Sequence, residues 1–233
     1  MAKVITIDGP SGSGKSSVAN YIAKVLKFKH LNSGYIYRSV AYALLDKFRL
    51  LDAEDAELDL ESIDLTEEAT SFFDKLSFKF EKQNFQVFLD KKFINPFLDS
   101  VLINKVVPRI SKLEAVRDRV KIIQRTLAQK HDLVAEGRDC GTEVFPDANV
   151  KIYFTASVGA RAERVFSRVS ILDKSASLES IKSVVAAKDY ADKHRVVGAL
   201  KPATEAIVFD STNYDLIASV KLLITIISSK LNH

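Results

Sequence analysis

The sequence predicts an α/β protein: a doubly wound, five-stranded parallel sheet flanked by helices, with a small antiparallel domain and a short helical segment inserted into it. Three observations support this fold class. A glycine-rich loop joins an apolar run to a helical pattern near the N-terminus. Four further short apolar runs are each followed by a polar loop and helical periodicity, the pattern of parallel βα units. One intervening region alternates polar and apolar residues, which is typical of antiparallel hairpins.

The glycine-rich loop, residues 9–16, reads Gly-Pro-Ser-Gly-Ser-Gly-Lys-Ser and matches the phosphate-loop pattern G-x-x-x-x-G-K-S/T. It lies between the apolar run 4–7 and a helical pattern, the context in which such a loop binds phosphate. Its glycines let backbone N–H groups point inward, and the helix N-terminus adds partial positive charge. We expect Lys15 to reach the outer phosphates of a nucleoside triphosphate and Ser16 to hold Mg²⁺. A glycine-rich surface turn, the alternative, would not explain the flanking strand and helix.

The remaining elements follow from periodicity. Parallel strands are predicted at five apolar runs: 4–7, 30–31, 133–135, 150–155 and 206–209. The region 46–105 departs from this pattern. Its apolar residues alternate over 76–80 and 85–89 on either side of Lys82-Gln83-Asn84, so we expect a hairpin in a small inserted domain.

A second insertion is predicted at 168–195. Ser177 is expected to cap a helix whose apolar face comprises Leu178, Ile181, Val184 and Val185. Later on this helix, charged residues spaced i, i+4 and i+7 project from one side: Lys188, Asp192 and Arg195. An exposed helix with ordinary ion pairs is the alternative. The core would then comprise 1–45, 106–167 and 196–233.

Composition limits the class of protein to which this chain can belong. With 233 residues, 47% of them hydrophobic, the chain can bury one sizeable core. The single Cys140 excludes an internal disulfide and is typical of a reducing cytosol. The longest apolar stretch, 220–227, is far shorter than the roughly 20 residues of a membrane span and is predicted to be a buried C-terminal helix. With no signal peptide and no conspicuous apolar interface, the sequence predicts a cytoplasmic monomer.

Charge is distributed unevenly along the chain. The net charge of +4 is too small to indicate nucleic-acid binding. Nine of the 30 acidic residues lie in 52–68, which has no basic residue and is predicted to be a solvated helical face. The rest of the chain therefore holds 34 basic and 21 acidic residues. This excess indicates anionic partners, and two nucleotides would suit it.

A second anion site is indicated by two loops that follow predicted strands. In the first, Ser33 is expected to cap a helix that carries Arg38 one turn later, and a helix N-terminus with an arginine binds phosphate. In the second, glycines flank the pair Arg138-Asp139 at a strand's carboxyl end, where ligands bind in such sheets. A capped helix with a solvated arginine and a surface ion pair are the alternatives. Cys140 is interpreted as a packing thiol.

Five ordered blocks of the chain resemble bacterial cytidylate kinases, members of the P-loop nucleoside monophosphate kinases: GPSGSGKS, LNSGYIYR, VAEGRDCGTEVFPDANVKIYFTAS, KDYADKHR and ALKPATEAIVFDST. The resemblance spans nearly the whole chain. It implies transfer of the γ-phosphate of ATP, with Mg²⁺, to the small-molecule acceptor CMP or dCMP, without nucleic-acid or membrane partners. It also implies that 46–105 is an enlarged nucleoside-monophosphate-binding insert and that 168–195 is a mobile lid.

The resemblance assigns roles to particular residues. Ser33 and Arg38 match acceptor-site residues, with Arg38 on the CMP phosphate, and Arg117 matches a base-contacting arginine. Arg138 and Asp139 match the pair that holds the acceptor phosphate and helps read cytosine. Lid residues complete the set, with Asp192 on the sugar hydroxyls and Lys188, Arg164 and Arg195 as cations near the transferred phosphoryl group. The ATP site comprises Gly9, Pro10, Ser11, Gly12, Ser13, Gly14, Lys15, Ser16 and Ser17.

The chain departs from the family pattern at four positions. Lys188 replaces an arginine, which keeps the charge but loses the planar fork that grips phosphate. Val165 replaces one member of an arginine pair, Pro108 a base-reading serine, and Asn32 an aspartate. A kinase of UMP, dTMP or shikimate on the same scaffold is one alternative function. A nucleotide-dependent switch ATPase is another, but it would not need a second phosphate site.

Overall fold

The structure is a computed structural model and describes residues 2–51, 64–172 and 174–231. By its internal contacts the chain divides into two compact units. One is formed by Met1–Leu31 with Ala128–His233, and the other by Asn32–Leu127.

The predicted insert 46–105 falls within the second unit, and the predicted lid 168–195 falls within the first. Their assignment as functional domains stays a prediction. Most of the acidic stretch 52–68 lies outside the described residues. Its end forms α3 (Leu65–Ser71), which begins where Asp64 accepts hydrogen bonds from the backbone N–H groups of the first helical turn.

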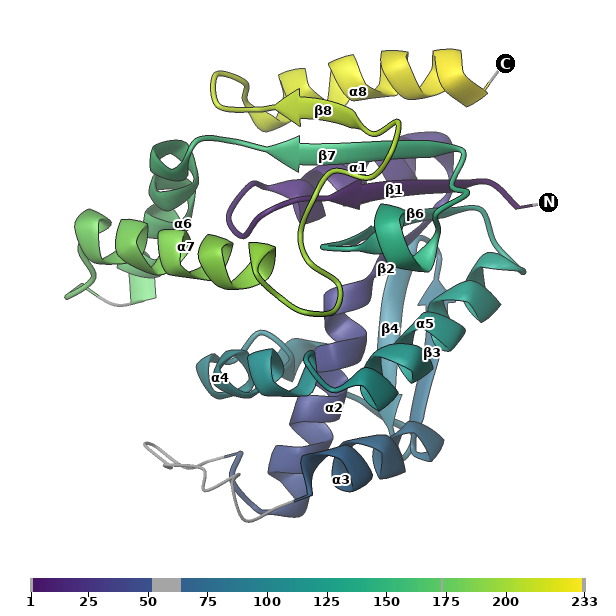
Figure 1. Ribbon diagram of the computed structural model, residues 1–233, viewed down its shortest axis with the longest axis vertical. Coiled ribbons are helices and arrows are strands. Elements are labelled where there is room, and N and C mark those ends of the chain that lie inside the picture. Colours follow the sequence, from purple (N-terminus) through teal and green to yellow (C-terminus); the bar gives the residue numbers. More distant parts are fainter. Residues whose placement is uncertain (1, 52–63, 173, 232–233) are drawn as a thin grey trace. The chain divides into compact units, whose positions relative to one another are not determined.

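The first unit contains a five-stranded sheet with the strand order β2-β6-β1-β7-β8. The pairs β1–β6, β1–β7 and β7–β8 are parallel, as predicted. The carboxyl ends of β1 and β7 point toward the side of the sheet where α6 and α7 lie (Figure 1). Each predicted strand is present, with these bounds: β1 Val4–Asp8, β2 Lys29–Asn32, β6 Leu133–Gly137, β7 Val150–Thr155 and β8 Ile207–Asp210.

The core of the first unit forms where α1 (Lys15–Leu26) and α8 (Leu216–Leu231) pack against the sheet. α1 buries Val18 and Ile22, which are four residues apart and so share one helix face. The predicted C-terminal helix is confirmed, since α8 buries Val220, Leu223 and Ile227. Among the helices of the described part of the chain, none is long and apolar enough to cross a membrane.

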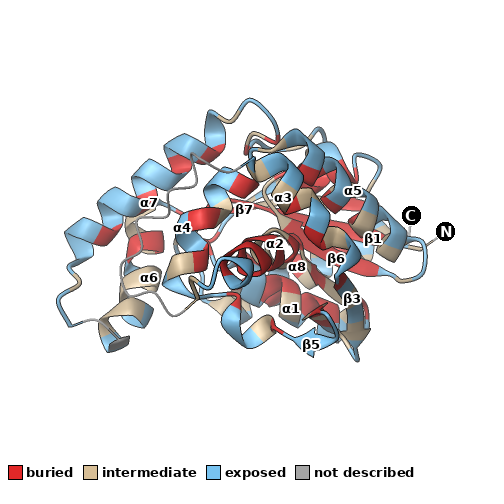
Figure 2. Ribbon diagram, turned by 90° about the horizontal axis from the view of Figure 1, so that it is seen from below, coloured by how far each residue is buried: buried red, intermediate tan, exposed pale blue. Residues whose placement is uncertain are grey.

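Two helices of the first unit that pack together, α6 (Val158–Leu172) and α7 (Leu178–Lys193), form the predicted lid region and the segment before it. Ser177 caps α7 as predicted, in a reciprocal capping box with Ser180. The predicted apolar face of α7 is only partly right, because Ile181 and Val185 are buried whereas Leu178 and Val184 are exposed. Most of α7 is exposed (Figure 2). α7 therefore buries a narrow apolar stripe, with about one apolar residue from each of two successive turns.

The second unit contains the predicted hairpin. β3 (Leu76–Glu81) and β4 (Asn84–Leu89) pair antiparallel and are joined at Lys82, whose φ of 53° lies in the left-handed region. A third strand, β5 (Lys92–Phe93), was not predicted. It follows a two-residue turn in which both residues have positive φ, a hairpin geometry that usually requires Asn or Gly. The turn residues are Asp90 and Lys91, so the usual sequence signal is missing.

Helices complete the second unit: α2 (Ser33–Lys47), α4 (Val101–Ile110) and α5 (Glu114–Ala128), the last of which ends at the unit boundary. α2 is the central element, because it buries a continuous series of apolar residues against its neighbours, among them Ile36, Val40, Leu44 and Leu45. Short 3₁₀ turns connect the sheet to the helices at Phe72–Asp74 and Asn95–Phe97.

Candidate active site

The phosphate loop has the predicted geometry. It connects the end of β1 to the start of α1, and Gly12 and Gly14 have φ values of 75° and 92°, in the left-handed region that favours glycine. Gly14 is the N-cap of α1. No side chain caps the amide groups of the first turn at that residue, so they remain available to a phosphate.

Gly9 has a different requirement, because a Cβ atom built on it would lie 2.0 Å from the backbone oxygen of Phe154. We expect Gly9→Ala to lower the free energy of unfolding by about 2 kcal/mol or more, since backbone atoms of β7 would have to move. The matched control is Gly159→Ala, where nothing lies within 4 Å of the added Cβ. Urea denaturation of both variants tests this. Equal stability of Gly9→Ala and the wild type would show that the loop tolerates the added methyl group.

Lys15 is buried beside the loop, where its Nζ donates to the backbone oxygen of Pro10 at 3.3 Å. Burial and, to a smaller extent, the positive charge of Arg138 lower the pKa of this lysine from 10.5 to about 7. The negative charges of Glu136 and Asp192 act in the opposite direction. Without a nucleotide, the ammonium group therefore has too little compensating negative charge. A bound triphosphate would supply it.

Ser16 donates its hydroxyl hydrogen to Oε2 of Glu136 at 2.7 Å. Glu136 is buried at the carboxyl end of β6, and its Oε1 lies 3.3 Å from Nε2 of His30. Although burial opposes ionisation, the hydrogen bond and charge of His30, with the charge of Lys15, keep the pKa of Glu136 below its usual value. Sequence reasoning assigned Glu136 no role. Its place at the carboxyl end of a strand was a signal that could have identified it.

Asp8 connects the end of β1 to the loop after β6 through hydrogen bonds. Its two carboxylate oxygens accept hydrogen bonds from the backbone N–H groups of Cys140 and Gly141 at 2.9 and 2.7 Å. Burial raises the pKa of Asp8 to about 6 despite these bonds. A Cβ on Gly141 would lie 2.8 Å from Oγ1 of Thr6, so this glycine is required for close packing. Cys140 is fully buried, as predicted for a packing thiol.

The first unit brings three predicted site residues together: two of the acceptor site, Arg138 and Asp192, and the lid cation Arg195. Nε of Arg138 donates to Oδ2 of Asp192 at 2.7 Å, and Arg195 donates to Oδ1 of the same carboxylate. Asp192 is buried, and Lys188, one turn earlier on α7, is exposed. Asp139 is also buried in this region. The cluster therefore contains two arginines around one carboxylate.

Arg164 has a structural role that was not predicted. Its guanidinium donates to the backbone oxygens of Ser13 at 2.8 Å and Ser211 at 2.7 Å. It thereby links α6 to both the phosphate loop and the loop after β8. Its expected contact with a transferred phosphoryl group stays a prediction.

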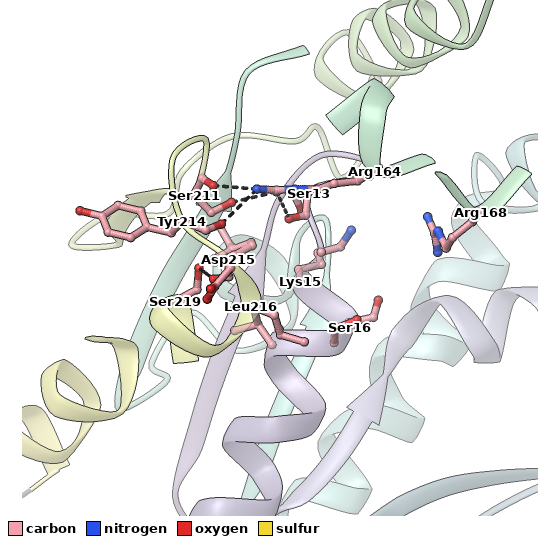
Figure 3. A pocket seen from close by; sticks show the side chains of 15 residues that line it. Ser13, Lys15, Ser16, Arg164, Arg168, Ser211, Tyr214, Asp215, Leu216 and Ser219 are labelled. Carbon is pink, nitrogen blue, oxygen red and sulfur yellow. Dashed lines mark hydrogen bonds between the residues drawn. The ribbon is translucent and has the colours of Figure 1, made fainter. Parts of the chain in front are cut away.

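A cavity of about 400 Å³ opens beside the phosphate loop (Figure 3). Lys15 and Ser16 lie on one side of it, and the loop that leads into α8 lies on another. Arg168 of α6 also lines the cavity, although the sequence did not single it out. Its position next to the loop makes the cavity the candidate site for the triphosphate donor.

The second unit holds the other predicted acceptor-site residues, and one expectation for them is wrong. The cap of α2 is Asn32, whose Oδ1 accepts from the N–H of Tyr35, and Ser33 is the first helical residue rather than the cap. Asparagine caps helices as well as serine does, so either assignment was physically sound. Arg38 folds back over the helix N-terminus, since a Cβ on Gly34 would lie 2.9 Å from its Nη1.

Arg117 is buried on α5, where its Nη1 donates to the backbone oxygen of Ser111 at 3.3 Å. Pro108 lies inside α4 and, without an N–H group, provides only its carbonyl, which accepts from the hydroxyl of Ser111 at 3.4 Å. Ser111 therefore contacts both the predicted base-binding arginine and the residue that replaces the usual serine.

A family model described as cytidylate kinase matches residues 5–229. The chain belongs to the cytidylate kinase family. A cytidylate kinase of Acinetobacter baumannii (strain ATCC 17978) is 34% identical, covering 98% of this chain and 97% of that protein. A cytidylate kinase of Pseudomonas putida (strain KT2440) is 36% identical, covering 93% and 91%. The crystal structure of an uncharacterized protein from Eubacterium ventriosum has a TM-score of 0.51 at 14% identity, covering 98% and 99%, and shows the fold alone.

As a cytidylate kinase family member, the chain is an enzyme of the kinase class. Its departures from the family pattern have structural consequences at two positions. Val165 packs at the contact between α6 and α7, and its Cγ2 would lie 3.0 Å from a Cβ on Gly12. Asn32 preserves the cap of α2 without a charge. The described contacts give no reason for lysine at position 188.

The lowered pKa of Lys15 predicts proton uptake when nucleotide binds. Below pH 7 the lysine is already protonated, but between about pH 7 and 10.5 the unliganded folded protein holds fewer protons here than the unfolded chain. Bound phosphates raise this pKa, so at pH 8.5 binding of AMP-PNP should take up close to one proton. Calorimetry in buffers of different ionisation enthalpy measures the uptake. It should be absent in Lys15→Met and unchanged in Lys24→Met, and equal uptake in all three would contradict the assignment.

Proposed function

We propose that this cytidylate kinase family member transfers the γ-phosphate of ATP to CMP or dCMP, giving ADP and CDP or dCDP. The observation that supports this most is the proximity of two anion-binding groups in one unit. Lys15 of the phosphate loop is close enough to Arg138 and Asp192 for their charges to change its pKa. This proximity supports a donor phosphate site and an acceptor phosphate site that would share the carboxyl end of the sheet, as phosphoryl transfer between two nucleotides requires.

The donor site would be formed by the loop residues Gly9, Pro10, Ser11, Gly12, Ser13, Gly14, Lys15, Ser16 and Ser17, with the triphosphate in the cavity beside them. The residues present suit Mg²⁺, since the Ser16 hydroxyl and the Glu136 carboxylate are oxygen ligands only 2.7 Å apart. When bound, Mg²⁺ would neutralise charge on the donor phosphates. Glu136 would hold the Ser16 hydroxyl or an Mg²⁺-bound water in position.

The family resemblance assigns the acceptor residues. In the second unit, Arg38 at the N-terminus of α2 would bind the phosphate of CMP, and Arg117 would contact cytosine. In the first unit, Arg138 would bind the phosphate and Asp139 would contact cytosine. Ser33 would bind the acceptor nucleotide next to Arg38. In the lid, Asp192 would exchange its arginine partners for the sugar hydroxyls, which would release Arg138 and Arg195 toward phosphate.

Catalysis by this arrangement would consist mainly of positioning and charge neutralisation. The attacking oxygen of CMP is already ionised near neutral pH, so the transfer needs no general base. Lys15 would offset charge that develops on the transferred group, with Lys188, Arg195 and Arg164 contributing from the lid side. Exclusion of water by the lid would limit ATP hydrolysis. We also propose a cytoplasmic monomer.

A panel of acceptors tests the function. ADP release from Mg·ATP should be fast with CMP and dCMP and slow with UMP, dTMP, AMP and shikimate. Fast turnover with UMP would indicate that Pro108 has relaxed base selectivity. Slow ATP hydrolysis that no acceptor accelerates would contradict the proposal and place the protein among switch ATPases.

A further inference from the structure

One face of α6 carries three arginines beside the phosphate loop. Arg161, Arg164 and Arg168 are spaced i, i+3 and i+7, so they project from the same side of the helix. Arg161 and Arg164 connect α6 to the phosphate loop by hydrogen bonds. Nη1 of Arg161 donates to the backbone oxygen of Ser11 at 3.0 Å, and Nη1 of Arg164 donates to that of Ser13 at 2.8 Å.

Arg168, the third of the series, lines the donor cavity together with Lys15 and Ser16. Figure 3 shows its guanidinium across the cavity from Ser211, with its nitrogens turned toward Lys15. Within the described part of the chain, it has neither a hydrogen-bond acceptor nor a carboxylate partner. The guanidinium therefore lies at the donor cavity with its five N–H donors available.

The other cations of the cavity are more restricted. Both Nη atoms of Arg164 already donate to backbone oxygens. Burial lowers the pKa of Lys15, so its charge depends on the ligand. Val165, which follows Arg164 on α6, carries no charge and packs against α7. Among the described cavity residues, Arg168 is thus the cation whose donors can all be given to a ligand.

We infer that Arg168 binds the triphosphate of the nucleotide donor. The inference rests on the proposed ATP-dependent function and adds a donor-binding residue to it. A planar guanidinium at the wall of this cavity can form two parallel hydrogen bonds with phosphate oxygens. Lys15 and the loop N–H groups would bind the same phosphates.

The test compares Arg168→Gln with the wild type in the full-length protein. We expect Arg168→Gln to weaken binding of Mg·AMP-PNP by about tenfold or more, the loss typical of a charged hydrogen bond. Binding of adenosine, measured by competition against a fluorescent nucleotide, should not change. In steady-state assays KM for ATP should rise while KM for CMP stays constant, and Arg168→Lys should restore part of the affinity. The matched control is Lys182→Gln, which removes an exposed charge from α7 outside the cavity.

Equal affinity of Arg168→Gln and the wild type for Mg·AMP-PNP at low salt would overturn the inference. So would an equal loss of affinity for adenosine, because the arginine would then act on the shape of the cavity. The binding measurement does not require phosphoryl transfer. If no acceptor in the panel is phosphorylated but Arg168→Gln still loses AMP-PNP affinity, the arginine assignment stands and the proposed acceptor is wrong.

Discussion

The Lys15→Ala variant is expected to fold normally and to lose turnover by a factor of about 10³ or more, the size of effect seen when a preorganised charge-stabilising donor is removed. The physical reason is the burial of the ammonium group at the phosphate loop, where water cannot replace it. Single-turnover kinetics with Mg·ATP and CMP measure the loss. The matched control is Lys24→Ala, which removes an exposed lysine about two and a half turns farther along α1 and should leave turnover unchanged.

The same variant should not be less stable than the wild type without nucleotide. Burial of Lys15 opposes folding: the cost is full below about pH 7, where the lysine is charged in both states, and falls to zero as the pH rises from about 7 to 10.5. Alanine removes that cost, so activity and stability should change in opposite directions. A soluble Lys15→Ala protein with near-normal turnover would disprove the role of the ammonium group. A protein unfolded at pH 6.5 would show that the lysine is structurally required.

The Arg161→Leu variant is expected to lower the free energy of unfolding by about 3–5 kcal/mol, because it leaves a buried carboxylate without its cation. The guanidinium of Arg161 forms a bidentate pair with Asp189, at 2.9 and 2.5 Å, and donates to the backbone oxygens of Ala156 and Ser11. One side chain therefore links α6, α7 and the phosphate loop. Urea denaturation with the double variant Arg161→Leu/Asp189→Leu separates the pair from the backbone contacts.

Most of the lost stability should return in the double variant, since an apolar pair replaces the uncompensated charge. The control is Lys121→Ala, which breaks an exposed ion pair with Asp118 and should change stability by less than about 1 kcal/mol. A loss of less than 1 kcal/mol in Arg161→Leu would mean that water reaches Asp189. No recovery in the double variant would assign the effect to the bonds with Ala156 and Ser11 instead.

Prediction from the sequence succeeded where the signal is local. The five strands, the phosphate loop, the hairpin and the cap at Ser177 each depend on residues within a few positions of one another, and each was confirmed. The errors have local causes too. Asn32 and Ser33 are adjacent and cap equally well, so the sequence did not distinguish between them, and Asn32 is the cap. The two-residue turn at Asp90 and Lys91 lacks the glycine that would have revealed β5.

The sequence by itself determined the family, the place of the phosphate loop and the positions of the strands along the chain, because short-range patterns encode them. Only the tertiary structure decided which side chains meet. Ser16 and Glu136 are 120 residues apart and come together because β1 and β6 are neighbours in the sheet. Arg164 binds backbone oxygens and Arg168 lines the donor cavity because α6 packs beside the loop. Such partners depend on the order of strands and the packing of helices, which no short window of sequence contains.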